Sequence, residues 1–262
     1  MTDTPGEFPW LPCGSGETSA MLRAMNGYVQ DWLDTPLGRR VWLLERKLVH
    51  EALAQVFGWQ LLQIGLWGDA DGLVSAARTQ RKLLLARSGE HGVGLVSRSD
   101  ELGIASDSVD AVLLPHTLEY EPDPHEILRE VERILSGDGQ LIVLGFRPLS
   151  AWGMRHALSR EGFPPGLERF IGERRLRDWV KLLGFEVTHS RRYLFTVPWG
   201  GTVPPSQRFL ESAGERAWPL FAGAYLLKAR KRVYCLTPTR PRWQRRPSVV
   251  GGLAEPTARI RA

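Results

Sequence analysis

Two patterns of hydrophobic and polar positions alternate along the chain. Short apolar runs of the kind that form buried strands occupy residues 61–64, 82–86, 93–96, 111–114 and 141–144. Other segments place apolar residues at the three-to-four-residue spacing of a helix with one buried face. Strands that alternate with helices predict an α/β domain with a mostly parallel sheet and helices on both faces.

Three segments predict helices with clear limits. The first begins at Thr35-Pro36, where threonine suits the cap and proline the first turn, and runs towards Gly58. The second begins at Asp123-Pro124 and runs to Gly137, and the third ends at Gly184. Their apolar faces are Val41, Leu44, Leu48, Ala52 and Val56; Ile127, Leu128, Val131, Ile134 and Leu135; and Leu176, Trp179, Val180 and Leu183.

The last two apolar runs differ from the earlier ones. Residues 185–187, extending to 193–195, and residues 224–227, extending to 234, have no strong helical pattern between them. This arrangement predicts an antiparallel hairpin at the sheet edge.

Three regions are expected along the chain. Residues 1–57 are predicted to form a flexible leader and a helical cap, and residues 58–238 the main domain. Residues 239–262 are predicted to be a basic, disordered tail because they are rich in Pro, Arg, Ser and Gly.

The net charge of +5 lies in that tail. Residues 240–262 hold six arginines and one glutamate, so the other 28 basic and 28 acidic residues cancel. Nucleic acid is therefore not favoured as a partner of the main domain, since nucleic-acid-binding domains carry a basic face of their own. An RNA-associated protein recruited through its tail remains an alternative.

The remaining composition excludes several classes. No apolar run is long enough to cross a bilayer, no signal peptide is visible, and the only cysteines are Cys13 and Cys235. A cytoplasmic protein without a membrane partner or a disulfide framework is expected. The six histidines are scattered and no CxxC or HxxxH spacing occurs, so no metal site is predicted. The oligomeric state does not follow from the sequence.

The most informative block is residues 106–145. It contains Asp107-Ser108-Val109-Asp110, an apolar strand, Leu118-Glu119-Tyr120, Asp123-Pro124, and Gly137-Asp138-Gly139 before another strand. This order resembles the methyltransferase type 11 family of S-adenosylmethionine (SAM) enzymes. The resemblance implies the class I methyltransferase version of the Rossmann-like fold, with a mostly parallel seven-stranded sheet and an antiparallel edge strand.

The resemblance also implies a SAM site at the ends of the strands. Gln63, Gly65, Gly68 and Asp69 would approach the methionine end of SAM, Asp100 and Glu101 the adenine, and Pro115 the region of the methyl group. The family places an acid before Gly-x-Gly-x-Gly, whereas this chain has Gln63 there, with Trp67 and Asp69 in place of the second and third glycines.

Two other acidic contacts differ as well. Arg87 follows the second strand, where the family has an acid for the ribose hydroxyls, and Arg98 stands at the adenine position unless Asp100 shifts into it. These departures predict weak SAM binding, because charge-assisted hydrogen bonds are lost.

Candidate catalytic residues are His116 and Tyr120, just beyond the fourth strand. A general base is needed only if the attacking group arrives protonated, since positioning can supply most of the catalysis of methyl transfer. The alternative is that His116 is a loop residue and that Tyr120 packs on the sheet. The leading hypothesis is a SAM-dependent methyltransferase with an unidentified methyl acceptor. The alternative is a catalytically degenerate methyltransferase-like scaffold that binds a partner.

Overall fold

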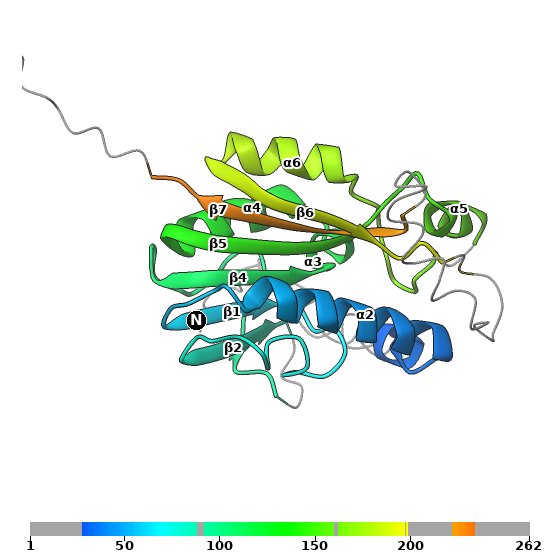
Figure 1. Cartoon of the computed structure of the whole chain (residues 1–262), viewed down its shortest axis with the longest axis horizontal. Coiled ribbons are helices and arrows are strands. Elements are labelled where there is room, and N and C mark those ends of the chain that lie inside the picture. Colours follow the sequence, from blue (N-terminus) through cyan, green and yellow to red (C-terminus); the bar gives the residue numbers. More distant parts are fainter. Residues whose placement is uncertain (1–27, 88–91, 160–161, 197, 199–221, 234–262) are drawn as a thin grey trace, which may run out of the picture.

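The protein is described by a computed structural model, which covers residues 28–87, 92–159, 162–196, 198 and 222–233. A seven-stranded sheet with the order β3-β2-β1-β4-β5-β7-β6 forms its centre (Figure 1). The strands are β1 (Gln60–Ile64), β2 (Arg81–Ala86), β3 (Leu95–Val96), β4 (Val109–Pro115), β5 (Leu135–Phe146), β6 (Phe185–Tyr193) and β7 (Ala224–Lys231).

Strands β1 to β5 are parallel, and β7 runs antiparallel between β5 and β6. The antiparallel pair therefore closes one edge of the sheet, and the predicted fold class is confirmed. Strand β5 begins earlier than expected, because Leu135 already pairs with Val109 before the register shifts to Ala111 and Gln140.

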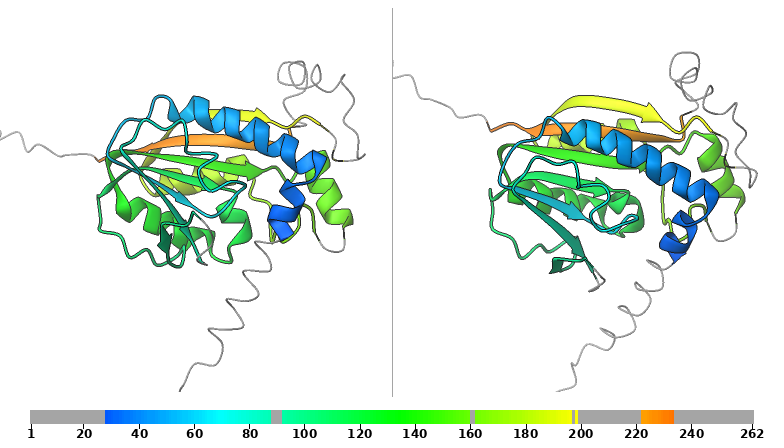
Figure 2. Two further views of the ribbon diagram at one scale, coloured as in Figure 1. Left: turned by 90° about the horizontal axis from the view of Figure 1, so that it is seen from below. Right: turned by 60° about the horizontal axis from the view of Figure 1, so that its bottom comes forward.

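Helices cover both faces of the sheet. They are α2 (Pro36–Leu53), α3 (Thr117–Tyr120), α4 (Pro124–Ile134), α5 (Ala151–Leu158) and α6 (Glu173–Leu182). Helix α2 lies across one face, and α4 and α6 lie behind the other (Figures 1 and 2). Residues 28–33, also helical, precede α2. No helix in the described part of the chain has the length and apolarity to cross a membrane.

The predicted cap explains where α2 begins, whereas α4 begins at Pro124 without a side-chain cap hydrogen bond from Asp123. Thr35 accepts a hydrogen bond from the backbone amide of Gly38 at 3.1 Å, which satisfies one free donor of the first turn of α2. Helix α2 ends at Leu53 rather than near Gly58, and Val56 N donates to Leu53 O in the turn that follows.

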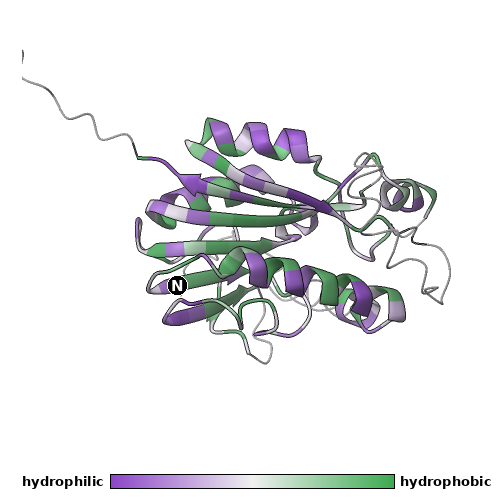
Figure 3. Cartoon of the chain, in the orientation of Figure 1, coloured by the Kyte–Doolittle hydropathy of each residue, from purple (hydrophilic) through white to green (hydrophobic). Residues whose placement is uncertain are grey.

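The strand period of two divides the core between the faces. Leu61 and Leu113 pack towards α2, whereas Leu62 and Leu114 pack towards α4 and α6. Figure 3 shows the apolar colouring concentrated in the central strands and the polar colouring on the outer side of α6. This rigid centre fixes the positions of the loops that follow β1, β2 and β4. The predicted leader (1–20) and tail (239–262) lie outside the described residues.

Candidate functional site

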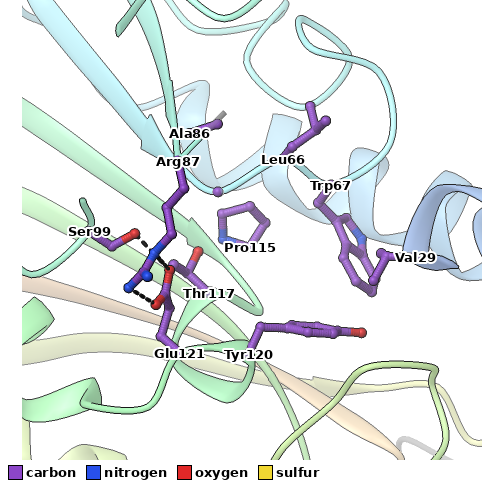
Figure 4. A pocket seen from close by; sticks show the side chains of 11 residues that line it. Val29, Leu66, Trp67, Ala86, Arg87, Ser99, Pro115, Thr117, Tyr120 and Glu121 are labelled. Carbon is purple, nitrogen blue, oxygen red and sulfur yellow. Dashed lines mark hydrogen bonds and ion pairs between the residues drawn. The ribbon is translucent and has the colours of Figure 1, made fainter. Parts of the chain in front are cut away.

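A pocket opens at the carboxyl ends of the parallel strands. Strand β1 has β2 on one side and β4 on the other, so the connections from it diverge there, which is where ligands bind in open α/β sheets. The lining consists of Val29; Gly65, Leu66 and Trp67 after β1; Ala86 and Arg87 at β2; Ser99; and Pro115, Thr117, Tyr120 and Glu121 after β4 (Figure 4).

The pocket is narrow. Its cavity volume is about 80 Å³, below the roughly 300–1,000 Å³ usual for small-molecule sites. A ligand as large as a nucleoside would therefore extend through the open side or displace a lining side chain.

An ion pair forms the polar edge of the pocket. Arg87 Nε donates to Glu121 Oε1 at 2.9 Å, and a second guanidinium nitrogen donates to the other carboxylate oxygen (Figure 4). Ser99 Oγ also donates to Glu121 Oε1, at 2.9 Å. Burial raises the pKa of Glu121, and the charge of Arg87 only partly opposes that effect. This chain lacks the acid that the family has after the second strand, but the carboxylate of Glu121 reaches the same pocket from the β4 side.

The floor of the pocket requires a glycine. Gly65 has φ +94°, and a Cβ there would lie 2.8 Å from Thr117 Oγ1, which itself donates to Ile64 O. The neighbouring Gln63 is fully buried and donates through Nε2 to Gly65 O at 3.0 Å. Gln63 Oε1 has no hydrogen-bond partner among the described residues. A buried acceptor left without a donor is costly.

The structure brings together only part of the predicted cofactor set. Gly65 and Pro115 line the pocket, and Gln63 is hydrogen-bonded to Gly65. Gly68 and Asp69 are not in the lining. Gly68 has φ +70°, and a Cβ there would lie 2.0 Å from the Trp42 indole nitrogen, so this glycine serves the packing of α2.

The predicted adenine contacts are also outside the lining. Arg98 binds Asp100 with Nε–Oδ1 at 3.0 Å and approaches Glu101 Oε2 at 3.8 Å. The hydrogen bond from Arg98 lowers the pKa of Asp100. Their neighbour Ser99 lines the pocket instead.

Tyr120, one of the two candidate catalytic residues, lines the pocket. Its hydroxyl is buried without a hydrogen-bond partner in the described part of the chain. Burial raises the pKa of Tyr120 well above its usual value of 10, so the hydroxyl is neutral at physiological pH.

His116, the other candidate, lies beneath the pocket and not in its lining. The side chain is fully buried, with Nε2 3.0 Å from Glu45 Oε1 and Nδ1 3.0 Å from Glu119 Oε2. The imidazole also stacks on Phe146 with ring centroids 4.2 Å apart. Burial lowers the pKa of His116, but Glu45 and Glu119 outweigh that effect and raise it to about 9. His116 is therefore an imidazolium that donates both protons to carboxylates.

The two carboxylates connect His116 to the rest of the site. Glu45 Oε2 accepts from Trp67 Nε1 at 2.6 Å, and Glu45 Oε1 accepts from Tyr193 at 2.9 Å. Glu119 Oε1 accepts from the backbone amides of Phe146 at 2.8 Å and Ile171 at 3.4 Å. We call His116, Glu45, Glu119, Trp67 and Tyr193 the buried charge cluster.

Sequence reasoning missed Glu45 and Glu121. Glu45 stands four residues after Val41 and four before Val49, so the helical spacing that predicts the buried face of α2 includes it. A charged residue on such a face indicates a buried partner. Glu121 had no comparable signal, since its pairing with Arg87 depends on the tertiary fold.

Comparison with known proteins identifies relatives. Residues 49–143 match the family model described as a methyltransferase domain. The chain is 34% identical to the YafS protein of Escherichia coli over 176 residues, which are 64% of this chain and 69% of YafS. It is 30% identical to the Rv2003c protein of Mycobacterium tuberculosis over 185 residues, 64% of this chain and 60% of that protein.

Solved structures share the fold. A SAM-dependent methyltransferase of Thermotoga maritima matches with a TM-score of 0.60 and 21% identity, covering 81% of this chain and 100% of that one. A chain from the Haloferax volcanii complex of the Trm112 methyltransferase activator with a methyltransferase matches with a TM-score of 0.57 and 16% identity, covering 80% and 98%. The [4+2]-cyclase SpnF matches with a TM-score of 0.52 and 20% identity, covering 72% and 81%.

Proposed function

Because the chain belongs to the methyltransferase-domain family and shares the fold of SAM-dependent methyltransferases, we propose that it binds SAM in the pocket lined by Gly65 and transfers the methyl group to an acceptor. The observation that carries the proposal is the position of this pocket, at the carboxyl ends of β1 and β4 with Gly65 as its floor. The bound cofactor would supply an electrophilic methyl group, so the protein would mainly have to position two reactants.

The residues present fit the cofactor in part. The unpaired Oε1 of Gln63 would accept a hydrogen bond from the ammonium group of SAM, and the backbone of Gly65, which is in the lining, would face the cofactor. Glu121 would receive the ribose hydroxyls in place of the missing acid at the end of β2. Because Arg87 already occupies this carboxylate, SAM has to compete with an ion pair, and weak binding follows.

The roles of Tyr120 and His116 differ in this proposal. Tyr120 lines the pocket with a neutral hydroxyl, so it would orient the acceptor by donating a hydrogen bond rather than remove a proton. His116 is a buried imidazolium and has no acceptor atom to offer, so it would position Trp67 and α3 through Glu45 and Glu119.

A non-catalytic scaffold is the second candidate, and the Arg87–Glu121 ion pair favours it. If this pair is permanent, it closes the polar edge of a cavity that is already small for SAM. The fold does not decide between the two candidates, because one fold can host different chemistries.

Calorimetric titration with SAM and with its demethylated product tests the proposal. We expect a dissociation constant for SAM weaker than about 10 μM, within reach of calorimetry. Glu121→Gln should weaken binding by about tenfold, as expected for the loss of a charge-assisted hydrogen bond. Arg87→Met, which breaks the same ion pair but keeps the carboxylate, should leave SAM affinity unchanged or strengthen it.

The two variants separate the alternatives. No binding by the wild type at about millimolar SAM would favour the scaffold. Equal weakening by both variants would mean that the ion pair supports the fold of the pocket and that Glu121 does not contact the cofactor. Transfer of a labelled methyl group from SAM to an acceptor would establish catalysis itself.

A further inference from the structure

A second hollow lies near the pocket and is lined by arginines. It has a volume of about 470 Å³ and lies between the residues that follow β5, the start of α6 and the end of β6. Arg147, Arg174, Arg177 and Arg192 line it, and Glu173 is the acidic residue of its lining. Arg147 has a partner of its own, since its Nη1 donates to Ala222 O at 3.4 Å. The other three guanidinium groups and the one carboxylate leave an excess of two positive charges.

Glu173 organises the hollow but does not neutralise it. Its Oε1 accepts from Arg177 Nη2 at 2.9 Å and its Oε2 from Arg192 Nε at 2.7 Å. Burial raises the pKa of Glu173, but the hydrogen bonds and charges of its partners outweigh burial and lower it. The carboxylate is thus ionised and holds two arginine side chains at fixed positions.

The remaining guanidinium donors point to an anionic ligand. Burial and the neighbouring charge of Arg192 lower the pKa of Arg147, so the cations of this hollow lie close together. Arg177 Nε is buried and has no hydrogen-bond partner in the described part of the chain. Arg174 is exposed at the start of α6, a helix whose N-cap, Gly172, offers no side chain to the free amides. Arginine forks, free amides and positive charge together suit a phosphate group.

The hollow is connected to the SAM pocket through Glu119. Glu119 binds the amides of Phe146 and Ile171, which directly precede the hollow residues Arg147 and Gly172. The next residue, Tyr120, lines the SAM pocket. A small molecule with one end held by the arginines would have to extend towards Tyr120 to reach the methyl group.

We infer that this hollow binds the phosphate group of the methyl acceptor, which is a phosphorylated small molecule. This inference rests on the proposed function, since the acceptor has a role only if SAM binds. The two excess charges suit a phosphate dianion better than a carboxylate, because a single negative charge would leave one of them uncompensated. Outside residues 240–262 the 28 basic and 28 acidic residues of the chain cancel, which favours a small phosphate ester over RNA.

The first test is titration of the full-length protein with inorganic phosphate, without SAM. We expect saturable binding that Arg174→Gln and Arg147→Gln each weaken by about tenfold, as expected when a charge-assisted hydrogen bond is lost. Arg175→Gln is the matched control. It removes the same charge from the neighbouring position of α6, where the guanidinium lies 4.9 Å from the Trp179 ring centroid. Its phosphate affinity should equal that of the wild type.

The second test uses labelled SAM and a small-molecule extract of cells. Label should pass from SAM to a compound in the extract. Phosphatase treatment of the extract should abolish this transfer, and the Arg174→Gln variant should reduce it about tenfold. Transfer that is insensitive to phosphatase would overturn the inference, as would equal phosphate affinity of Arg174→Gln and Arg175→Gln. Binding of an RNA oligonucleotide that depends on Arg174, without phosphate binding, would overturn it in favour of nucleic acid.

The two proposals fail in different ways. Absence of SAM binding in calorimetry would refute the proposed function and with it the role of the acceptor. The phosphate titrations need no SAM and would still show whether the hollow binds anions. If the protein binds SAM but not phosphate, the inferred phosphate site is refuted and the proposed function is not.

Discussion

Nε2 of His116 lies 3.0 Å from Oε1 of Glu45, a residue 71 positions away in the sequence, and both side chains are fully buried. The contact joins α2 to the segment between β4 and α3. The other oxygen of Glu45 accepts from Trp67, which forms part of the pocket wall. The position of that wall therefore depends on the ion pair below it.

Glu45→Gln should destabilise the fold strongly. The substitution removes the negative charge and leaves the imidazolium with one carboxylate partner in a dry environment. Loss of one partner of a buried ion pair typically costs about 3–5 kcal/mol. Urea denaturation should show a drop of this size in the free energy of unfolding.

Glu51→Gln on the same helix is the control for Glu45→Gln. Glu51 pairs with Arg191 at 2.8 Å, but both side chains are partly exposed. An exposed ion pair contributes about 0–1 kcal/mol. If the two substitutions lower the free energy of unfolding equally, the buried charge cluster does not account for the effect of Glu45→Gln.

Stability should fall as the pH rises from neutral to about 9. The pKa of His116 is about 9 in the folded protein and 6.5 in the absence of its partners. A group whose pKa is raised by folding stabilises the fold fully at pH values below its unfolded pKa. This stabilisation is lost as the pH rises through its folded pKa. The loss should be on the order of 3 kcal/mol between these limits.

Measurement of the free energy of unfolding across that range, for the wild type and for His116→Gln, checks this prediction. Tyr193 also faces Glu45, and burial raises its pKa well above 10, so it stays neutral throughout the range. His116→Gln should lower stability at neutral pH and flatten the profile. A wild-type profile as flat as that of the variant would mean that the imidazole is uncharged in the fold.

Gly65→Ala should weaken SAM binding and lower the melting temperature. The new Cβ would meet Thr117 Oγ1 at 2.8 Å, and φ +94° is unfavourable for alanine. Such strain costs on the order of 1–3 kcal/mol. Gly103→Ala is the control, since nothing lies within 4 Å of its Cβ position. Normal SAM affinity in a folded Gly65→Ala protein would remove Gly65 from the cofactor site.

Local sequence signals predicted the alternation of strands and helices, and the family resemblance supplied the seven-stranded sheet. The apolar runs of β1, β2, β4 and β5 lie inside the observed strands, and Thr35-Pro36 and Asp123-Pro124 mark the observed helix starts. These signals act over a few residues, so they can be interpreted without tertiary information. Gly58 and Gly137 did not mark the helix ends, because strand pairing and a turn set those boundaries.

The site was less predictable because its contacts join distant segments. Glu45 meets His116, Arg87 meets Glu121, and Glu173 meets Arg192, and each pair comes from different elements of the fold. The motif at Gly65 identified the correct region of the sheet. It did not reveal that Gly68 packs on Trp42 or that a carboxylate enters from the β4 side.

Removal of residues 239–262 should leave the fold intact and reduce retention of RNA. The tail carries the whole net charge of the chain and has few apolar residues, so we expect the melting temperature of the truncated protein to match that of the full chain. Arginine contacts to a polyanion, at Arg240, Arg242, Arg245 and Arg246, would be independent of sequence and would weaken steeply with salt. Trp243 among them could stack on a base.

Phosphate titration of the truncated protein separates the tail from the arginine-lined hollow. If the hollow takes a small phosphate ester, truncation should leave phosphate affinity unchanged while RNA retention at low salt falls. A large drop in melting temperature would show instead that the tail packs on the domain. Equal RNA retention by the full and truncated chains, lost on Arg174→Gln, would place the nucleic-acid contact at the hollow, because the local excess of arginines there would then outweigh the neutral sum of the domain.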